Sequence, residues 1–143
     1  MRSCIRAPIE TIWQIRTNVD EWPSWQPDVD GAKAECPLEV GSAFRWQTAG
    51  LDIISTVEEI DAPRRIVWGG PAQGIVAVHV WTFEPQDDGV LVRTAESWEG
   101  EPVTAQVEAL QAALDGSLRG WWRTSSAPLK AVGRYERRIV EAA

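Results

Sequence analysis

The chain has 143 residues, near the commonest size for a single domain, so we expect one domain with one core. Its 14 basic and 21 acidic residues give a net charge of −7, which repels phosphate backbones and excludes nucleic acid as an expected partner. No stretch approaches the roughly 20 apolar residues of a membrane span, and the N-terminal segment lacks the apolar run of a signal peptide. We therefore expect no stable membrane insertion and a cytoplasmic protein.

The N-terminal part predicts one strand and two short helices. A strand is expected at residues 3–6, before Pro8, which suits the first turn of a helix. Apolar residues recur at helical spacing over residues 8–17 and predict a helix there. Asp20 offers an N-cap for a second short helical turn, where Pro23 is tolerated because it lies near the start.

Residues 29–98 read as six strands. Five turn signals interrupt an alternating pattern: PLEVG, QTAGLD, DAPRR, GGPAQG and PQDDG. Strands joined by such turns form an antiparallel meander, and the N-terminal strand makes seven. One side of each strand is more apolar than the other, which assigns that side to the core. The residues predicted to face inward are Phe44, Trp46, Ile53, Ser55, Val57, Ile66, Trp68, Ile75, Ala77, His79, Trp81, Phe83, Val90, Val92, Thr94, Glu96 and Trp98.

An amphipathic pattern after Gly100 predicts a long helix over residues 103–127. At about 1.5 Å per residue it would be roughly 37 Å long, close to the length of a ten- or eleven-residue strand. A sheet with one aromatic face needs a cover, and this helix can lie along its whole length. Pro128 should end or kink it, which leaves residues 128–143 as a basic helical extension.

This order of elements resembles the START-like superfamily, also called SRPBCC, and within it the polyketide cyclase/dehydrase and lipid-transport group. The matching segments are IRAPIETIW at 5–13, WQPDV at 25–29, STVEEIDAPRRIVWGG at 55–70, HVWTFEP at 79–85 and ESWEG at 96–100. The resemblance covers residues 3–127. It implies an α+β helix-grip fold, in which a long C-terminal helix crosses the concave face of a curved seven-stranded antiparallel sheet and encloses a hydrophobic cavity. We accordingly expect a ligand-binding domain over residues 1–127, with 128–143 as its extension.

The chain has nine tryptophans, and so many in one small domain indicate a lined cavity as well as a packed core. One of Trp121 and Trp122 should face the sheet from the long helix. The residues predicted to contact a ligand are Phe44, Trp46, Ser55, Trp68, His79, Trp81, Thr94, Glu96, Trp98, Leu118 and Trp122.

His79 and Glu96 are the candidate catalytic residues. The single histidine could exchange protons near neutral pH, or it could be a hydrogen-bonded structural residue. A carboxylate on the inward face must find a partner or be held neutral, unless it reaches solvent or a helix arginine. Pairing around PQDDG places Trp81 roughly opposite Arg93 and His79 near Ala95 and Glu96, and one residue of slippage decides whether His79 and Glu96 touch.

Three functions fit these features. The first is binding of a small hydrophobic ligand, aromatic or polyketide-like. The alternative is a polyketide cyclase or dehydratase type of enzyme, in which the inward Glu/His pair exchanges protons with a carbonyl substrate. The third is a protein-interaction module that uses the extension after Pro128, which could also mediate a homodimer.

No cofactor and no metal is expected. The sequence contains no glycine-rich phosphate loop and no metal-ligand cluster. Cys4 and Cys36 lie 32 residues apart without a CxxC motif, and we interpret both as free thiols.

Overall fold

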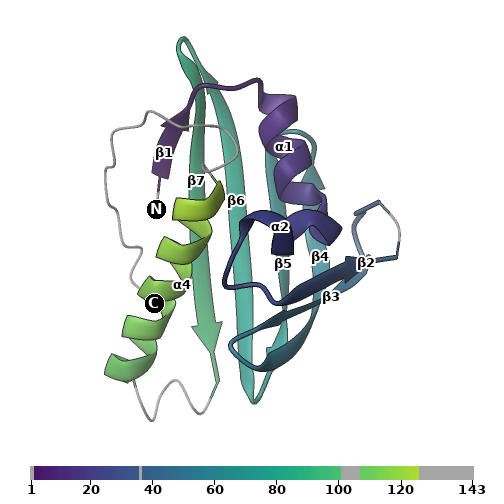
Figure 1. Ribbon diagram of the computed structural model, residues 1–143, viewed down its shortest axis with the longest axis vertical. Coiled ribbons are helices and arrows are strands. Elements are labelled where there is room, and N and C mark those ends of the chain that lie inside the picture. Colours follow the sequence, from purple (N-terminus) through teal and green to yellow (C-terminus); the bar gives the residue numbers. More distant parts are fainter. Residues whose placement is uncertain (1, 36, 101–106, 126–143) are drawn as a thin grey trace.

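A computed structural model describes residues 2–35, 37–100 and 107–125 of the chain. Its framework is one curved antiparallel sheet of seven strands in the order β1-β7-β6-β5-β4-β3-β2 (Figure 1). The predicted meander is therefore confirmed, and the N-terminal strand pairs with the last one. The strands are β1 (Arg2–Ile5), β2 (Gly31–Ala34), β3 (Ala43–Thr48), β4 (Leu51–Asp61), β5 (Arg65–Ala72), β6 (Ile75–Gln86) and β7 (Gly89–Glu99).

The helices that the structure describes lie on one face of this sheet (Figure 1). They are α1 (Ile9–Thr17), the 3-10 turn η1 (Val19–Glu21), α2 (Trp22–Trp25) and α4 (Val107–Ser125). The two small helices and the long C-terminal helix agree with the sequence prediction. The predicted start of the long helix at residues 103–106 and the extension at 128–143 lie outside the described residues.

Two hairpin turns mark one end of the sheet, which we call the open end. In the β3–β4 turn, Ala49 and Gly50 have φ angles of 49° and 77°, and in the β5–β6 turn Gln73 and Gly74 have φ angles of 49° and 81°. Two-residue loops with both residues at positive φ match the twist of paired strands, and glycine makes this conformation accessible. The opposite end, covered by α1 and α2, is the closed end (Figure 1).

The inward face forms the core as the alternation predicted. Phe44, Trp68 and Trp81 are at most 2% exposed, and Trp22 from α2 is fully buried against them. The indole of Trp22 meets the rings of Phe44 and Trp68 at centroid distances of 5.4 and 5.7 Å. Its Nε1 donates a hydrogen bond to the Arg16 carbonyl oxygen at 3.0 Å, so the polar atom of this buried ring is satisfied. Trp22 thus helps to anchor the short helices to the closed end.

The pairing of β6 with β7 differs by one residue from the predicted register. His79 lies opposite Glu96, and Trp81 lies opposite Thr94 rather than Arg93. The cause is the tight loop, because Gln86 pairs with Gly89 and only two residues lie between them. The slippage that sequence could not fix therefore brings His79 and Glu96 side by side.

Two further expectations concern the cysteines and the membrane. Cys4 forms no disulfide bond within the described residues, whereas Cys36 lies outside them. Within the part of the chain that the structure describes, no helix is both long enough and apolar enough to cross a membrane.

Candidate functional site

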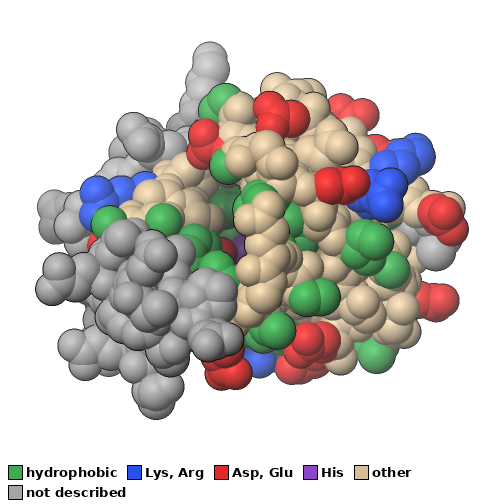
Figure 2. Space-filling model, turned by 90° about the horizontal axis from the view of Figure 1, so that it is seen from below, with side chains coloured by type: hydrophobic (Ala, Val, Ile, Leu, Met, Phe, Trp, Pro, Cys, Tyr) green, Lys and Arg blue, Asp and Glu red, His purple; other side chains and the backbone are tan. Residues whose placement is uncertain are grey.

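A cavity of about 610 Å³ lies between the concave face of the sheet and α4, toward the open end. Figure 2, which views the molecule from below, shows the surface hollowed there. Its walls come from the segment after α2, from strands β3 to β7 and from α4. Most lining side chains are apolar, including Val29, Leu51, Ile53, Ile75 and Ala77.

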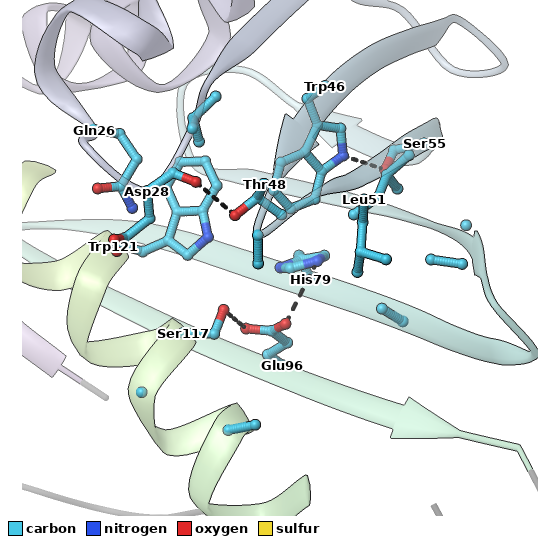
Figure 3. Close-up of a pocket in the computed structure, with 18 of the residues that line it drawn as sticks. Gln26, Asp28, Trp46, Thr48, Leu51, Ser55, His79, Glu96, Ser117 and Trp121 are labelled. Carbon is cyan, nitrogen blue, oxygen red and sulfur yellow. Dashed lines mark hydrogen bonds and ion pairs between the residues drawn. The ribbon is translucent and has the colours of Figure 1, made fainter. Parts of the chain in front are cut away.

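Three tryptophans border the cavity from different elements. Trp46 comes from β3, Trp98 from β7 and Trp121 from α4. The Trp46 Nε1 donates to the Ser55 Oγ at 3.0 Å, which orients the indole and leaves the Ser55 hydroxyl hydrogen available to another acceptor (Figure 3). The cavity therefore offers broad aromatic surface with a few fixed polar atoms.

Glu96 forms the centre of the polar cluster. Its side chain is 3% exposed. One carboxylate oxygen accepts a hydrogen bond from the Trp98 Nε1 at 2.7 Å, and the other accepts one from the Ser117 Oγ at 3.2 Å. Figure 3 shows Ser117 reaching Glu96 from α4. Two neutral donors on two elements hold this carboxylate in one orientation.

His79 faces Glu96 from the neighbouring strand (Figure 3). The His79 Nε2 lies 3.7 Å from the Glu96 Oε1, beyond hydrogen-bond distance. The imidazole is stacked on Trp68 at a centroid distance of 5.5 Å and an interplanar angle of 16°. Burial lowers the pKa of His79 below its usual value, the nearby Arg16 cation lowers it further, and Glu96 opposes both effects. The ring is therefore neutral at pH 7.

Arg16 lies outside the cavity lining but fixes one of its walls. Its guanidinium carbon lies 3.6 Å from the ring centroid of Trp81, 5.1 Å from Trp121 and 5.2 Å from Trp25. Burial lowers the pKa of Arg16 to about 9, which still leaves it charged at neutral pH. Attraction between this cation and the ring faces links α1 to β6, α2 and α4.

The sequence matches the family of Activator of Hsp90 ATPase homolog 1-like proteins over residues 6–132. The chain belongs to this family. No curated protein matches the chain significantly. The predicted kinship with the START-like superfamily is thereby confirmed, and solved structures support the fold.

Three solved structures illustrate this likeness. Hypothetical protein jhp0584 from Helicobacter pylori has a TM-score of 0.76 and 21% identity, with 90% of this chain and 85% of that chain covered. A START superfamily protein from Mycobacterium smegmatis has a TM-score of 0.72 and 14% identity, with 91% and 94% covered. The di-domain ARO/CYC StfQ from the steffimycin biosynthetic pathway has a TM-score of 0.75 and 14% identity, with 91% of this chain and 49% of that chain covered. At these identities the likeness shows the helix-grip fold alone.

Five of the residues predicted to contact a ligand line the cavity of this family member. They are Trp46, Ser55, His79, Glu96 and Trp98. The two candidate catalytic residues are thus in one cavity.

Phe44, Trp68, Trp81 and Thr94 lie on the same face but outside the lining. Each is at most 4% exposed, and they occupy the core beyond the cavity. Position along the strands does not explain this for Trp68, because it lies opposite His79, which lines the cavity. Instead, the ring of Trp22 from α2 packs on Phe44 and Trp68.

From α4, Leu118 is half-buried and does not line the cavity, whereas Trp121 does. The side chain of Trp122 lies outside what the structure describes. The sequence analysis expected one of Trp121 and Trp122 to face the sheet, and Trp121 does so.

Sequence reasoning missed the lining residues that come from loops and helix faces. Gln26 and Asp28 follow α2, and the Thr48 hydroxyl donates to the Asp28 carbonyl oxygen, which ties that segment to β3 (Figure 3). Alternation could not locate them because the path of a loop is not periodic. Ser117 lies one helical turn before Trp121 in α4, so both side chains are on the same face of the helix. Helical spacing from Trp121 could therefore have predicted Ser117 as a lining residue.

Gly120 lets α4 approach the segment after α2. A Cβ atom at this position would clash with the Asp28 carboxylate. Among the described residues, no group of three or more His, Cys, Asp or Glu side chains could hold a metal ion.

Proposed function

We propose that this protein binds a small, mainly apolar molecule in the cavity between the sheet and α4. The observation that carries the proposal is the cavity of about 610 Å³, bordered by three indoles and by one cluster of polar side chains. Ligand sites typically have volumes of about 300–1,000 Å³, apolar walls and a few polar groups that fix orientation. A ligand that fills this space would remove apolar surface from water, at roughly 25 cal/mol per Å².

The polar cluster supports a ligand with at least one hydrogen-bonding group. The Ser55 hydroxyl can donate, the Glu96 carboxylate keeps unused lone pairs, and the neutral His79 ring offers one donor and one acceptor. An aromatic or polyketide-like molecule with a polar substituent matches this arrangement. The family's fold accommodates such ligands, but the chemistry proposed here comes from the lining residues.

A saturation experiment tests this proposal. Purified protein is titrated with N-phenyl-1-naphthylamine, an uncharged apolar fluorophore, and we expect saturation near one probe per chain together with quenching of tryptophan emission. Ala77→Phe places a ring in the cavity and should weaken binding by at least about tenfold, because it occupies ligand volume. Val76→Phe is the matched control, since Val76 is 48% exposed on the outer face of the same strand.

Two results would overturn the binding proposal. One is the absence of saturable binding by the unmodified protein. The other is equal affinity in Ala77→Phe and Val76→Phe when circular dichroism shows that both variants are folded.

A second candidate function is acid–base catalysis of the cyclase or dehydratase type. The observation that favours it is the placement of His79 and Glu96 in one cavity with 3.7 Å between the Nε2 and Oε1 atoms. A neutral imidazole can take a proton from a carbon next to a carbonyl group, and the oriented carboxylate would stabilise the imidazolium that forms. The third hypothesis, an interaction module, depends on residues after Pro128, which the structure does not describe.

Turnover separates the binding protein from the enzyme. A linear poly-β-carbonyl thioester is incubated with protein and followed by mass spectrometry and ultraviolet absorbance. A binding protein returns it unchanged, whereas a cyclase releases water and forms a ring. In that case, His79→Gln and Glu96→Gln should each reduce the rate by at least about 100-fold while leaving probe binding within a few-fold.

A further inference from the structure

The charge inside the cavity limits which ligands can enter it. Glu96, Asp28 and Asp30 all line this space, and none of its described lining residues is a lysine or an arginine. Glu96 lies in the interior, whereas Asp28 and Asp30 are exposed. The cavity is therefore acidic from its interior to its exposed rim.

Among the described residues, no lysine or arginine forms a hydrogen bond or an ion pair with the Glu96 carboxylate, and the buried Arg16 cation, which acts on His79, lies outside the cavity lining. The hydrogen bonds of Glu96 come from the Trp98 indole and the Ser117 hydroxyl, which are both neutral. His79, its only ion-pair contact within the described part of the chain, carries no charge at neutral pH because burial opposes protonation. A carboxylate removed from water is costly unless a positive charge approaches it.

A second observation points to a ligand independently of the charge. The His79 side chain is 6% exposed and faces the cavity, and its contact with Glu96, the dashed line in Figure 3, is 3.7 Å long. This exceeds hydrogen-bond distance, and no other described residue forms a hydrogen bond to the ring nitrogens. A buried imidazole normally satisfies at least one nitrogen. The ring nitrogen nearest Glu96 is thus placed to meet the same ligand group as the carboxylate.

Aromatic rings complete the environment. Trp46, Trp98 and Trp121 border the cavity, with the rings of Trp46 and Trp121 in contact at a centroid distance of 5.9 Å, and the faces of indole rings attract cations within about 6 Å. A protonated amine has three N–H donors, so it can bond to the unused lone pairs of Glu96 and to His79 at once. An anionic ligand would meet the Glu96 charge without a compensating cation.

We propose that the cavity selects hydrophobic amines, in which a protonated nitrogen lies against Glu96 and His79 and the carbon framework packs against the three tryptophans. This proposal rests on the proposed function, because it names the chemical class of ligand for the same cavity. The ammonium loses water when it enters, and the charge-assisted bonds to Glu96 offset that loss.

Three naphthalene derivatives of nearly equal size test the selection. Isothermal titration calorimetry at pH 7 compares 2-naphthylmethylamine, which is protonated, with uncharged 2-naphthylmethanol and with anionic 2-naphthoate. We expect the amine to bind about tenfold more tightly than the alcohol and the carboxylate to bind more weakly than either. This ranking in the unmodified protein tests the proposal without any variant.

Variants then assign the preference to Glu96. Glu96→Gln should bring the amine to within about threefold of the alcohol and leave the alcohol's affinity nearly unchanged. Glu10→Gln, an equal change of charge on the exposed face of α1, should keep the tenfold preference. If Glu96→Gln does not fold, Asp28→Asn should still narrow the preference, because Asp28 lines the same cavity.

The possible failures are distinguishable. Equal affinities for the three compounds, or tighter binding of the alcohol or the carboxylate, would overturn the amine selection and leave the proposed binding function standing. A tenfold preference that survives in Glu96→Gln would also overturn it. Failure of all three compounds and of N-phenyl-1-naphthylamine to bind would overturn the proposed function itself.

Discussion

The closed and open ends of the concave face carry the same kind of side chain and use it differently. At the closed end, Trp22 and Trp68 pack against Phe44, and each of these rings is at most 2% exposed. At the open end, Trp46 and Trp98 come from the same face of the sheet but border a cavity. The difference lies in the cover, because α1 and α2 lie over the closed end (Figure 1), whereas residues of α4 and of the sheet enclose the cavity toward the open end.

On two strands, the change from cavity to packed core occurs between one inward-facing residue and the next. On β6, His79 lines the cavity, whereas Trp81, the next inward residue, does not. On β7, Glu96 lines it and Thr94 does not. The polar pair thus lies where packed core gives way to cavity, which exposes it to a ligand while keeping it largely out of water.

The largest effect should come from replacing tryptophans on the two sides of the border between core and cavity. Trp81→Ala should reduce the free energy of unfolding by about 3–5 kcal/mol, because it removes a ring that is 1% exposed and packed under Arg16. Trp98→Ala should cost clearly less, since its ring already borders empty volume, but it should weaken ligand binding. Urea denaturation measures the change in stability, and titration with N-phenyl-1-naphthylamine measures the change in binding. Equal losses of stability would show that the open end is packed as a core.

The alternation of side chains was sufficient to predict the sheet and its inward face. Turn signals such as QTAGLD located the hairpins, and inward residues from Phe44 to Trp98 were identified because a period of two assigns every strand residue to one face. The amphipathic pattern after Gly100 predicted the long helix as the cover of that face, and the family resemblance implied the same arrangement. These parts of the fold depend on local patterns, so they can be predicted from the sequence alone.

Depth along each strand could not be predicted in the same way. The alternation along their strands predicts that both Trp68 and Trp46 face inward. Of these two residues, Trp46 lines the cavity and Trp68 does not. Which ring is covered depends on where α1 and α2 pack, and that is a tertiary property. The His79–Glu96 contact likewise depended on one residue of register in the loop after Gln86.

The second prediction concerns pH and tests whether His79 is buried in the folded protein although it lines the cavity. Its folded-state pKa is lowered by burial, so as pH falls below the unfolded value of about 6.5 the unfolded chain takes up a proton before the folded protein does. The stability contributed by the neutral ring is therefore present above that pH and lost below it, at up to about 1.4 kcal/mol per pH unit. Urea denaturation between pH 7.5 and 5 should show a steeper loss in the native sequence than in His79→Gln. Parallel curves would contradict the burial of this imidazole.

The third prediction compares two glycines on α4 at the open end. Gly116→Ala should increase stability by about 0.5–1 kcal/mol, because alanine favours the helix and a Cβ there meets no atom within 4 Å. Gly120→Ala should bring no such gain, since its Cβ would displace the Asp28 carboxylate from the wall of the cavity. Thermal unfolding measures the difference between the two variants. An equal increase for both would mean that Asp28 does not hold α4 closely.

The smallest effect is expected on the outer face of the same strands, which the described helices do not cover. Arg93 on β7 donates from its Nη1 to the Glu84 Oε2 on β6 at 2.6 Å, and both side chains are about half exposed. Such pairs gain little, because water screens the charges and two long side chains lose freedom, so a double-mutant cycle with Arg93→Ala and Glu84→Ala should give a coupling of about 0–1 kcal/mol. The affinity for N-phenyl-1-naphthylamine should stay unchanged in both variants. A larger Arg93–Glu84 coupling energy, or a change in probe affinity, would mean that the outer face controls how β6 and β7 position His79 and Glu96 in the cavity. The difference between the two ends would then depend on the outer face as well as on the helices that cover the concave face.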